Sequence, residues 1–444
     1  MSSSRRALLF AALCTPLLAA LFAPLLTTFV RAEKPTDPRS TSRNDSRSTS
    51  SDTAEDIPNK IGGKTYDEWK KDLEHKDPSV RSNTIRVIPS FGVKAESAVP
   101  ILVARTHDQD ASCRVKAVIA FQFMAIRGTD RVRVVKALGE RISSDPQAIV
   151  RYEAAKALRR FGPDGREVVA DLVRGVGDSG TYELREACII ALIVAGVDPT
   201  KGPDVRVTDA LILRSKAGIE PTTQVRLEAI IALGAMGRPQ DPKKLAQVFG
   251  ALKQNFLSPN KIIKIWAHVS VMALEDKVDK TYLKTIADYL KDPERDIRVQ
   301  AVTALGALKD KAQDYLPDML KLFRAREDSE VVIAASQALG HMGNKGPRVL
   351  QALINQTEKT DVKDVPIILA AASALAQLAP EDAEVVAALQ KVRSGGLLTL
   401  QQKETLRLAI EDGKKAKIDD TKPKARIENP KLNTGATGRP NKTR

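Results

Sequence analysis

The feature that most constrains this chain is an internal repeat. The motif that ends at Arg81 returns at intervals of 33, 37, 34, 41, 38, 34, 34 and 36 residues. The repeated position holds, in order, Arg81, Arg114, Arg151, Arg185, Arg226, Lys264, Arg298, Val332 and Ile368. A unit of this length suits two helices and their turns, and a self-similar period of this size is the signature of a stacked array.

Apolar spacing within each unit predicts helices. In most copies a small residue stands three positions after the repeated one and a larger apolar residue seven positions after it, as Ala301 and Leu305 follow Arg298. Positions 0, 3 and 7 share one face of a 3.6-residue helix. A second apolar pattern precedes each motif, for example over 283–290. We therefore expect an all-α fold, a right-handed α-solenoid of the ARM/HEAT-like kind with about nine helical-hairpin repeats.

Turn residues mark the helix ends. Asp-Pro pairs at 77–78, 145–146 and 292–293 predict helix starts, with Asp as the cap and Pro in the first turn. Thr65 and Glu68 form a capping-box pattern at the start of the first unit. Glycines stand eleven positions after the repeated one in five units, where a left-handed cap is expected: Gly92, Gly162, Gly196, Gly237 and Gly343.

The strings DPSVRSNTIRVI, QVRLEAIIALGAMG, DIRVQAVTALGAL and EVVIAASQALGHMG resemble HEAT repeats, particularly the phycobilisome-lyase-type HEAT-like variety. The resemblance covers about 61–412. It implies that the second helix of each hairpin lines a concave binding surface. The opening IGGKTYDEW, followed by KDPSVR, also resembles the start of many exported bacterial HEAT proteins. Because HEAT arrays serve many partners, the resemblance bears on fold more than on function.

The two ends of the chain read differently from the repeats. Arg5 and Arg6 precede an apolar run from Ala7 to Val30, which predicts a signal peptide cleaved after Ala32 or, alternatively, an uncleaved membrane anchor over 1–32. Residues 33–60 read as a disordered linker, 61–412 as the solenoid and 413–444 as a disordered basic tail. We expect an exported protein of the periplasm or cell envelope.

The row of basic residues admits two interpretations. It can be a ladder in which each cation pairs with an acidic or carbonyl group of its own or a neighbouring unit, and acids four residues earlier (Asp77, Asp110, Glu294) are candidates. It can instead be a stripe that binds phosphates, with affinity that falls steeply with salt. The ladder is favoured. The net charge of +15 supports nucleic-acid binding only weakly, because the tail alone carries +7 and residues 61–412 carry +6.

The remaining special residues predict no chemistry. Trp69 and Trp266 are candidate aromatic anchors, although Trp69 is expected to cap the open end of the solenoid and Trp266 to be partly buried. Cys113 and Cys188 occupy small core positions and are expected to be free and buried. The sequence contains no His-Glu dipeptide, CxxC or GxSxG motif, phosphate-binding loop or HExxH helix. We expect no catalytic, cofactor-binding or metal-binding residue.

These observations favour a non-catalytic scaffold or adaptor, monomeric, that binds a protein partner along the concave face. Two alternatives stay open: a solenoid that binds nucleic acid or another anionic polymer, and a lyase-type enzyme or subunit related to phycobilisome lyases. A nucleic-acid partner is disfavoured, because aromatic residues make up only 4% of the chain. The basic tail could also contact an anionic surface.

Overall fold

The computed structural model describes residues 59–323 and 327–421. They divide into two compact units, unit 1 up to Ala312 and unit 2 from Gln313. The predicted signal peptide or anchor, nearly all of the linker 33–60 and the end of the basic tail (422–444) lie outside the described residues, as does Cys14.

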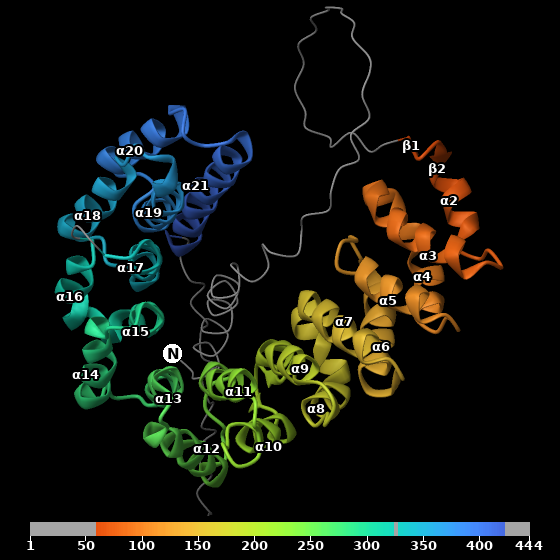
Figure 1. The fold of residues 1–444 in the computed structure, drawn as a ribbon, viewed down its shortest axis with the longest axis horizontal. Helices are drawn as coiled ribbons and strands as arrows, with labels where there is room; N and C mark the ends of the chain where they lie inside the picture. Colours follow the sequence, from red (N-terminus) through yellow and green to blue (C-terminus); the bar gives the residue numbers. More distant parts are fainter. Residues whose placement is uncertain (1–58, 324–326, 422–444) are drawn as a thin grey trace, which may run out of the picture. The chain divides into compact units, whose positions relative to one another are not determined.

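Unit 1 consists of helical hairpins whose helices form two layers (Figure 1). The B layer holds the helices that carry the repeat motif: α3 (Pro78–Val87), α5 (Ala111–Ala120), α7 (Ala148–Leu158), α9 (Tyr182–Ala195), α11 (Thr223–Ala235), α13 (Lys261–Leu274) and α15 (Arg295–Leu308). The A layer holds the helices that precede them: α2 (Tyr66–Asp72), α4 (Val99–Arg105), α6 (Gly128–Ser144), α8 (Val169–Val176), α10 (Val205–Arg214), α12 (Pro242–Gln254) and α14 (Lys280–Asp288). Each B helix packs on the next one, and within this unit the B layer lies on the inner side of the curve.

Unit 2 repeats the arrangement. Its A-layer helices are α16 (Leu316–Lys321), α18 (Pro347–Thr357) and α20 (Ala383–Ser394), and its B-layer helices are α17 (Ser329–Met342), α19 (Val365–Leu378) and α21 (Leu400–Thr421). Helix α19 packs between α17 and α21. Helix α21 runs through the predicted boundary at 412 and ends at Thr421; Gly413 lies against the backbone of α19, where a Cβ would collide with the Ala376 carbonyl.

Short 3-10 segments and strands complete the described chain. The 3-10 segments are η1 (Ile88–Ala98), η2 (Arg159–Val168), η3 (Asn255–Leu257), η4 (Tyr289–Lys291), η5 (Lys309–Tyr315) and η6 (Val362–Asp364). Two antiparallel two-residue hairpins pair β1 (Lys60–Ile61) with β2 (Lys64–Thr65) and β3 (Val197–Asp198) with β4 (Gly202–Pro203). The second hairpin belongs to the longest repeat spacing, between Arg185 and Arg226. The predicted all-α solenoid is confirmed.

The predicted register is also that of the structure. The repeated position is the fourth residue of every B-layer helix from α3 to α19. The small residue three positions later is fully buried in most units, as for Ala301, and so is the large one, as for Leu305. Small side chains here let the helices of neighbouring repeats approach closely, so each repeat buries its apolar surface against its neighbours.

Most of the predicted caps and turns are present in the structure. The Thr65–Glu68 capping box is present, and Asp77 caps α3 through the Ser79 N–H. Four of the five predicted glycines have positive φ, for example 57° at Gly92 and 53° at Gly162. Gly196 does not, with φ of −80°. There glycine is needed for space, since a Cβ would lie 2.7 Å from the Leu192 carbonyl oxygen.

In the described part of the chain, the segment Pro78–Arg105 has the length and apolar composition that would allow it to cross a membrane. It is not one straight helix. Gly92, at φ 57° and ψ −128°, breaks it between α3 and α4, and both helices pack in the first repeats. It has the properties of core helices rather than of a span.

Candidate binding face

The basic row of the B layer forms a ladder between neighbouring repeats. Arg81 donates from Nε and Nη2 to both carboxylate oxygens of Asp108, at 2.8 and 2.7 Å, and from Nη1 to the carbonyls of His75 and Lys76. Arg114 does the same with Asp145, at 2.8 and 3.1 Å. Arg185 pairs with Glu220 at 2.9 and 2.8 Å, and Arg151 contacts Asp178 at 3.3 Å.

Each aspartate of the ladder serves two arginines. The Asp108 carboxylate receives Arg81, and the Asp108 backbone carbonyl accepts Nη1 of Arg114 at 2.9 Å. Asp145 stands in the same relation to Arg114 and Arg151. The acids lie in the turn between the A and B helices of the next repeat, six or seven residues before that repeat's own arginine. The bonds therefore run continuously from Arg81 to Glu220.

The expected acids were wrong. Asp77 and Asp110 cap their own helices through backbone N–H groups, and Glu294 ion-pairs with Lys261. Asp145 and Asp292, expected as caps, each accept the backbone N–H two residues on and also a cation from the preceding repeat. A carboxylate four residues before the arginine stands at the start of the same helix, where free backbone N–H groups are the nearer donors.

Burial makes the ladder structural. The side chains of Arg114 and Arg185 are 9% and 7% exposed, and those of Asp145 and Glu220 are fully buried. Burial by itself would raise the pKa of the Asp108 carboxyl, but hydrogen bonds from Arg81, the Asp110 N–H and Arg105 outweigh it and lower that pKa. Guanidinium groups held in this way are not available to phosphates.

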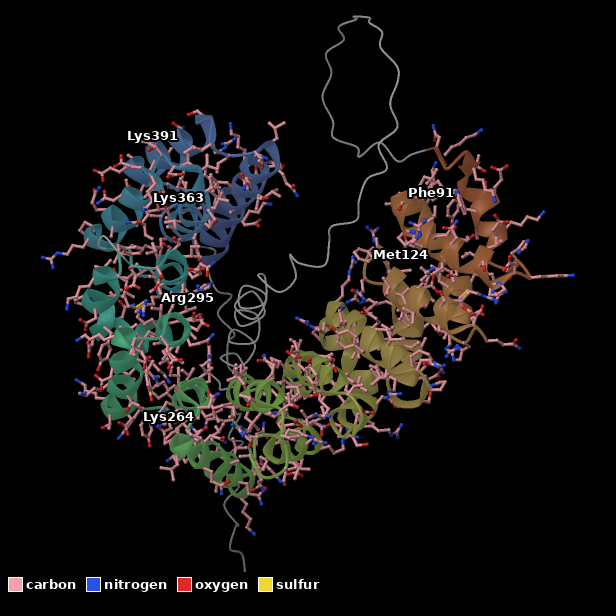
Figure 2. All side chains as sticks on the ribbon, viewed as in Figure 1. Phe91, Met124, Lys264, Arg295, Lys363 and Lys391 are labelled. Carbon is pink, nitrogen blue, oxygen red and sulfur yellow. The ribbon has the colours of Figure 1, made fainter. Side chains whose placement is uncertain are left out.

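The ladder stops at Arg226. In the next repeat the acid position holds Ser258, and the described residues provide no hydrogen-bond acceptor for the Arg226 guanidinium, whose Nε is buried. Lys264 (Figure 2) replaces arginine in α13, and the next acid, Asp292, pairs with Lys261 instead, at 3.0 Å. Arg298 returns to the carbonyls of Asp292 and Pro293.

Both tryptophans are packed into the protein. Trp69 is 8% exposed, and its Nε1 donates to the Ile61 carbonyl at 2.8 Å, so that the indole and the first hairpin together cover the end of the array. Trp266 is 4% exposed and donates to Gln300 at 2.7 Å. Neither ring is presented as an exposed anchor. Cys113 and Cys188 are free and buried as predicted.

The residues of the B layer that face away from the A layer form what we call the inner face, and two hollows of unit 1 lie there. The first hollow, between α3 and α5, is lined by Ile85, Arg86, Pro89, Ser90, Lys116, Ile119, Ala120 and Phe123. Phe123 is 70% exposed, although it belongs to a chain with few aromatic residues. Exposed aromatic side chains beside apolar depressions are typical of binding surfaces. Sequence reasoning missed Phe123, because nothing in the repeat pattern distinguishes it from a core residue.

The second hollow, between α7 with η2 and α9, is lined by Gln122, Lys156, Arg159, Arg160, Ile190, Ala191, Ile193 and Val194. Its base is aliphatic and belongs to α9, whereas its cations belong to α7 and η2. The inner face therefore combines apolar contact area with positive charge that is separate from the ladder.

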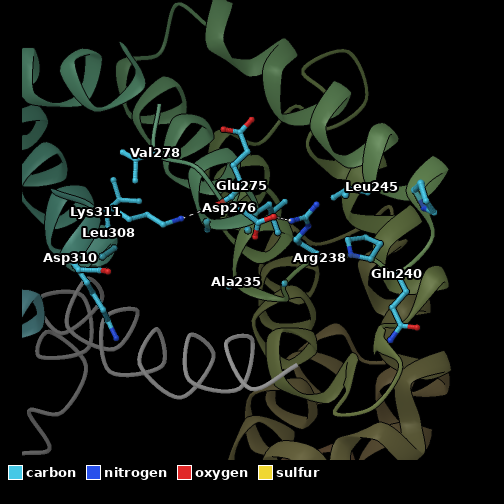
Figure 3. A pocket seen from close by; sticks show the side chains of 18 residues that line it. Ala235, Arg238, Gln240, Leu245, Glu275, Asp276, Val278, Leu308, Asp310 and Lys311 are labelled. Carbon is cyan, nitrogen blue, oxygen red and sulfur yellow. Dashed lines mark hydrogen bonds and ion pairs between the residues drawn. The ribbon is translucent and has the colours of Figure 1, made fainter. Parts of the chain in front are cut away.

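A third hollow lies at one edge of unit 1, where α11, α13 and α15 end (Figure 3). Two of its cations are bonded within the protein. Arg238 pairs with Asp276 at 2.5 Å, and Lys311 donates to the carbonyls of Met272 and Glu275. The two cations of this hollow are therefore already engaged by the protein.

Within residues 59–323 and 327–421, His, Cys, Asp and Glu side chains nowhere gather in a group of three or more that could hold a metal. The architecture itself defines an all-α solenoid.

Comparison with known proteins agrees with this class of fold. The family model described as HEAT repeats matches residues 266–339 and 283–376, so that this part of the chain carries HEAT repeats. A search of curated proteins found no match.

Three similar solved structures illustrate the range of matches. Karyopherin Kap121p bound to the C-terminus of Cdc14p is 13% identical, with 80% of this chain and 43% of that chain covered and a TM-score of 0.37. Kap95p, studied with RanGDP, is 14% identical, with 78% of this chain and 50% of that chain covered and a TM-score of 0.42. YIBA_ECOLI is 16% identical, with 74% of this chain and 92% of that chain covered and a TM-score of 0.33. The chain thus spans about half the length of the karyopherins that it matches.

Proposed function

We propose that this protein is a non-catalytic scaffold that binds an extended segment of a partner protein along the inner face of unit 1. The observation that carries the proposal is the first hollow, where exposed Phe123 and half-buried Ile119 adjoin Pro89 and the charged Arg86 and Lys116. A fixed aromatic side chain with an apolar depression and a charged rim is the usual centre of a protein interface.

The ladder argues against the nucleic-acid alternative. The arginines that suggested a phosphate stripe donate their hydrogen bonds to carboxylates and carbonyls of the protein itself. A phosphate-binding surface needs several free cations along the backbone of the ligand. The inner face of unit 1 also has one strongly exposed aromatic ring, Phe123. A protein that binds single-stranded nucleic acid stacks the bases on several such rings.

We further propose that the scaffold works in the bacterial cell envelope. The support is the pattern of Arg5 and Arg6 before the apolar run 7–30, with small or apolar residues before a cut after Ala32. Cell fractionation and N-terminal sequencing of the protein purified from its native host test this. Recovery in the envelope fraction with Glu33 as the first residue supports export with cleavage, whereas an intact, cytosolic chain overturns it.

The interface is tested by affinity capture from envelope extract, with the full chain as bait at low and moderate salt. Phe123→Glu replaces the exposed ring by a charge at an accessible position, so that binding should be lost while folding is retained. Leu257→Glu is the matched control, because Leu257 is 88% exposed and lies in η3, away from the hollow. Circular dichroism spectra of all three proteins should coincide.

We expect the wild type and Leu257→Glu to retain one specific protein at moderate salt and Phe123→Glu to lose it. Retention that vanishes at moderate salt, or that is lost when residues 422–444 are removed, would move the function to charge-driven attachment through the basic tail. Equal retention by all three baits would place the interface elsewhere.

A further inference from the structure

The second hollow of the inner face contains three cations, Lys156, Arg159 and Arg160, which differ in their bonding within the protein. Lys156 is paired with Glu153 at 3.0 Å, and Arg160 donates to the Gln122 carbonyl. Arg159, by contrast, has no hydrogen bond or ion pair with any residue in the described part of the chain, and its side chain is exposed within the hollow.

The carboxyl groups of Glu186 and Glu228, on α9 and α11, influence Arg159 electrostatically but form no ion pair with it, and both accept hydrogen bonds from Gln224. Gln224 of α11 donates to Glu228 at 3.1 Å and to Glu186 of α9 at 3.5 Å. Glu228 is 1% exposed, and its second carboxyl oxygen has no partner among the described residues. Because burial and the neighbouring Glu186 raise the pKa of Glu228 to about 8, this group keeps its proton at neutral pH, and Glu186 acts on Arg159 only from beyond ion-pairing distance.

The hollow therefore has a positively charged side, formed by α7 and η2, and an aliphatic side, formed by α9. Although the Arg159 side chain is partly open to solvent, the protein atoms around it lower its pKa by desolvation, so that a negative partner would stabilise its charge. Ile190 and Val194 lie beside it and are only partly covered. A ligand that fits both features carries a negative group next to an apolar one.

We propose that this hollow binds a carboxylate of an acidic segment of the partner protein, with Arg159 as the ion-pairing residue and Ile190 and Val194 as the contact for an adjacent apolar side chain. The inference rests on the scaffold function proposed above and specifies the chemistry of the partner. A guanidinium presents paired donors to a carboxylate, and the partly enclosed setting makes that pair stronger than an exposed one.

An acidic peptide fits this surface better than a nucleic acid does. One unpaired guanidinium over an aliphatic base matches a single carboxylate that follows or precedes a Leu- or Ile-like residue. A phosphate backbone offers no apolar group to Ile190 and Val194, and the ladder arginines are not free to contact the neighbouring phosphates.

The test is fluorescence anisotropy with the full chain and three labelled probes: a peptide of repeated Asp-Leu-Ser units, its Asn-Leu-Ser counterpart, and single-stranded DNA. The variants are Arg159→Glu and Arg159→Gln. Arg174→Glu is the charge-matched control, because Arg174 lies in the A layer and its side chain is 66% exposed. Thermal melting of each variant checks that it folds.

We expect the Asp-containing peptide to bind wild type and Arg174→Glu equally. Arg159→Gln should bind it about tenfold more weakly, as for the loss of one charge-assisted pair, and Arg159→Glu more weakly still. The Asn counterpart should bind every protein weakly. Unchanged binding by both Arg159 variants would overturn the carboxylate site, and so would absence of binding to wild type or preferential binding of DNA that is lost with Arg159.

The same variants separate this inference from the scaffold function. If Phe123→Glu abolishes capture of the partner and Arg159→Glu does not, the scaffold function stands and the carboxylate site fails. If neither substitution affects capture, both proposals fail.

Discussion

The early repeats of unit 1 and the repeats of unit 2 use the same helical register with opposite chemistry. At the fourth residue of the B helix, unit 1 places arginines that bond to carboxylates of the next repeat, whereas unit 2 places Val332 and Ile368, which are 6% and 2% exposed. Both kinds of residue fill the same position between stacked hairpins. The comparison shows that apolar packing fixes the register. The fourth position of the B helix can then be filled either by an arginine paired with a carboxylate or by an apolar side chain.

The largest test breaks one rung of the ladder. Arg185→Met leaves the fully buried carboxylate of Glu220 without its two-bond partner; Arg214 at 3.3 Å and the Thr222 N–H at 3.0 Å remain. Removal of one partner from a buried pair typically costs about 3–5 kcal/mol. We expect a loss of this size in the free energy of unfolding, measured by urea denaturation with circular dichroism.

The double variant Arg185→Met/Glu220→Leu imitates the apolar junction of unit 2 and is the control. It should recover most of the loss, because replacement of a whole buried pair by apolar residues is often neutral. A double variant no more stable than the single one would mean that unit 1, unlike unit 2, depends on its charges.

A second test uses the buried carboxyl of unit 1. The folded-state pKa of Glu228 lies above its ordinary value of 4.5, at about 8, so its contribution to stability is present below pH 4.5 and is lost as the pH rises through 8. Glu228→Gln removes the ionisation and should be the more stable protein at pH 9, by a few kcal/mol at about 1.4 kcal/mol per pKa unit.

The measurement is the free energy of unfolding from pH 5 to pH 9. Glu358→Gln in unit 2 is the control, because the Glu358 side chain is 54% exposed. Its profile should run parallel to that of the wild type. Parallel profiles for Glu228→Gln and the wild type would show that Glu228 is ionised in the folded protein.

A third test concerns the turn after the B helix. Lys309, eleven residues after Arg298, has φ 52° and ψ −121°, close to Gly162 at 53° and −122°. Side chains rarely adopt this conformation, so Lys309→Gly should raise the free energy of unfolding by about 1 kcal/mol. The converse Gly162→Lys should lower it. A loss of stability in Lys309→Gly would show that contacts of the lysine side chain outweigh the strain.

The smallest effect is expected for an ion pair between repeats at the surface. Lys391 and Glu358 of unit 2 lie 3.4 Å apart, with side chains 72% and 54% exposed. Exposed pairs contribute about 0.2–1 kcal/mol. Lys391→Ala should therefore change the urea midpoint little, and less in higher salt. If Lys391→Ala lowered the stability as much as Arg185→Met, burial could not explain why the ladder pairs are stronger than exposed pairs.

The sequence was sufficient to predict the array and its register, because apolar spacing repeats at every junction. The repeated position predicted the fourth residue of each B helix, from Arg81 to Ile368. The ladder partners were not predicted, since they belong to the following repeat. Their signal was nevertheless present in the acids six residues before the next motif, such as Asp108 and Asp145.

The candidate binding face could not be predicted in the same way. Phe123 and Arg159 occupy positions where other repeats hold unrelated residues, so no periodic pattern marks them. The free charge of Arg159 depends on which neighbouring side chains reach it, and that is decided by rotamers and by the spacing of α7 and α9. Composition was only weak evidence for a ligand, and Arg81 and Arg114 bond to carboxylates of the following repeat.

The way in which one aspartate serves two arginines bears on how such a chain can change its length. Each of the early repeats carries both an arginine donor and, in its turn, an acceptor for the arginine before it. A gene that lost residues 115–151 would bring Asp178 to the place that Asp145 now holds opposite Arg114, with no charge left over. Duplication of the same segment would be equally self-consistent. The early repeats are thus interchangeable parts for recombination, and the region around Ser258 is where such exchange would leave an arginine unmatched.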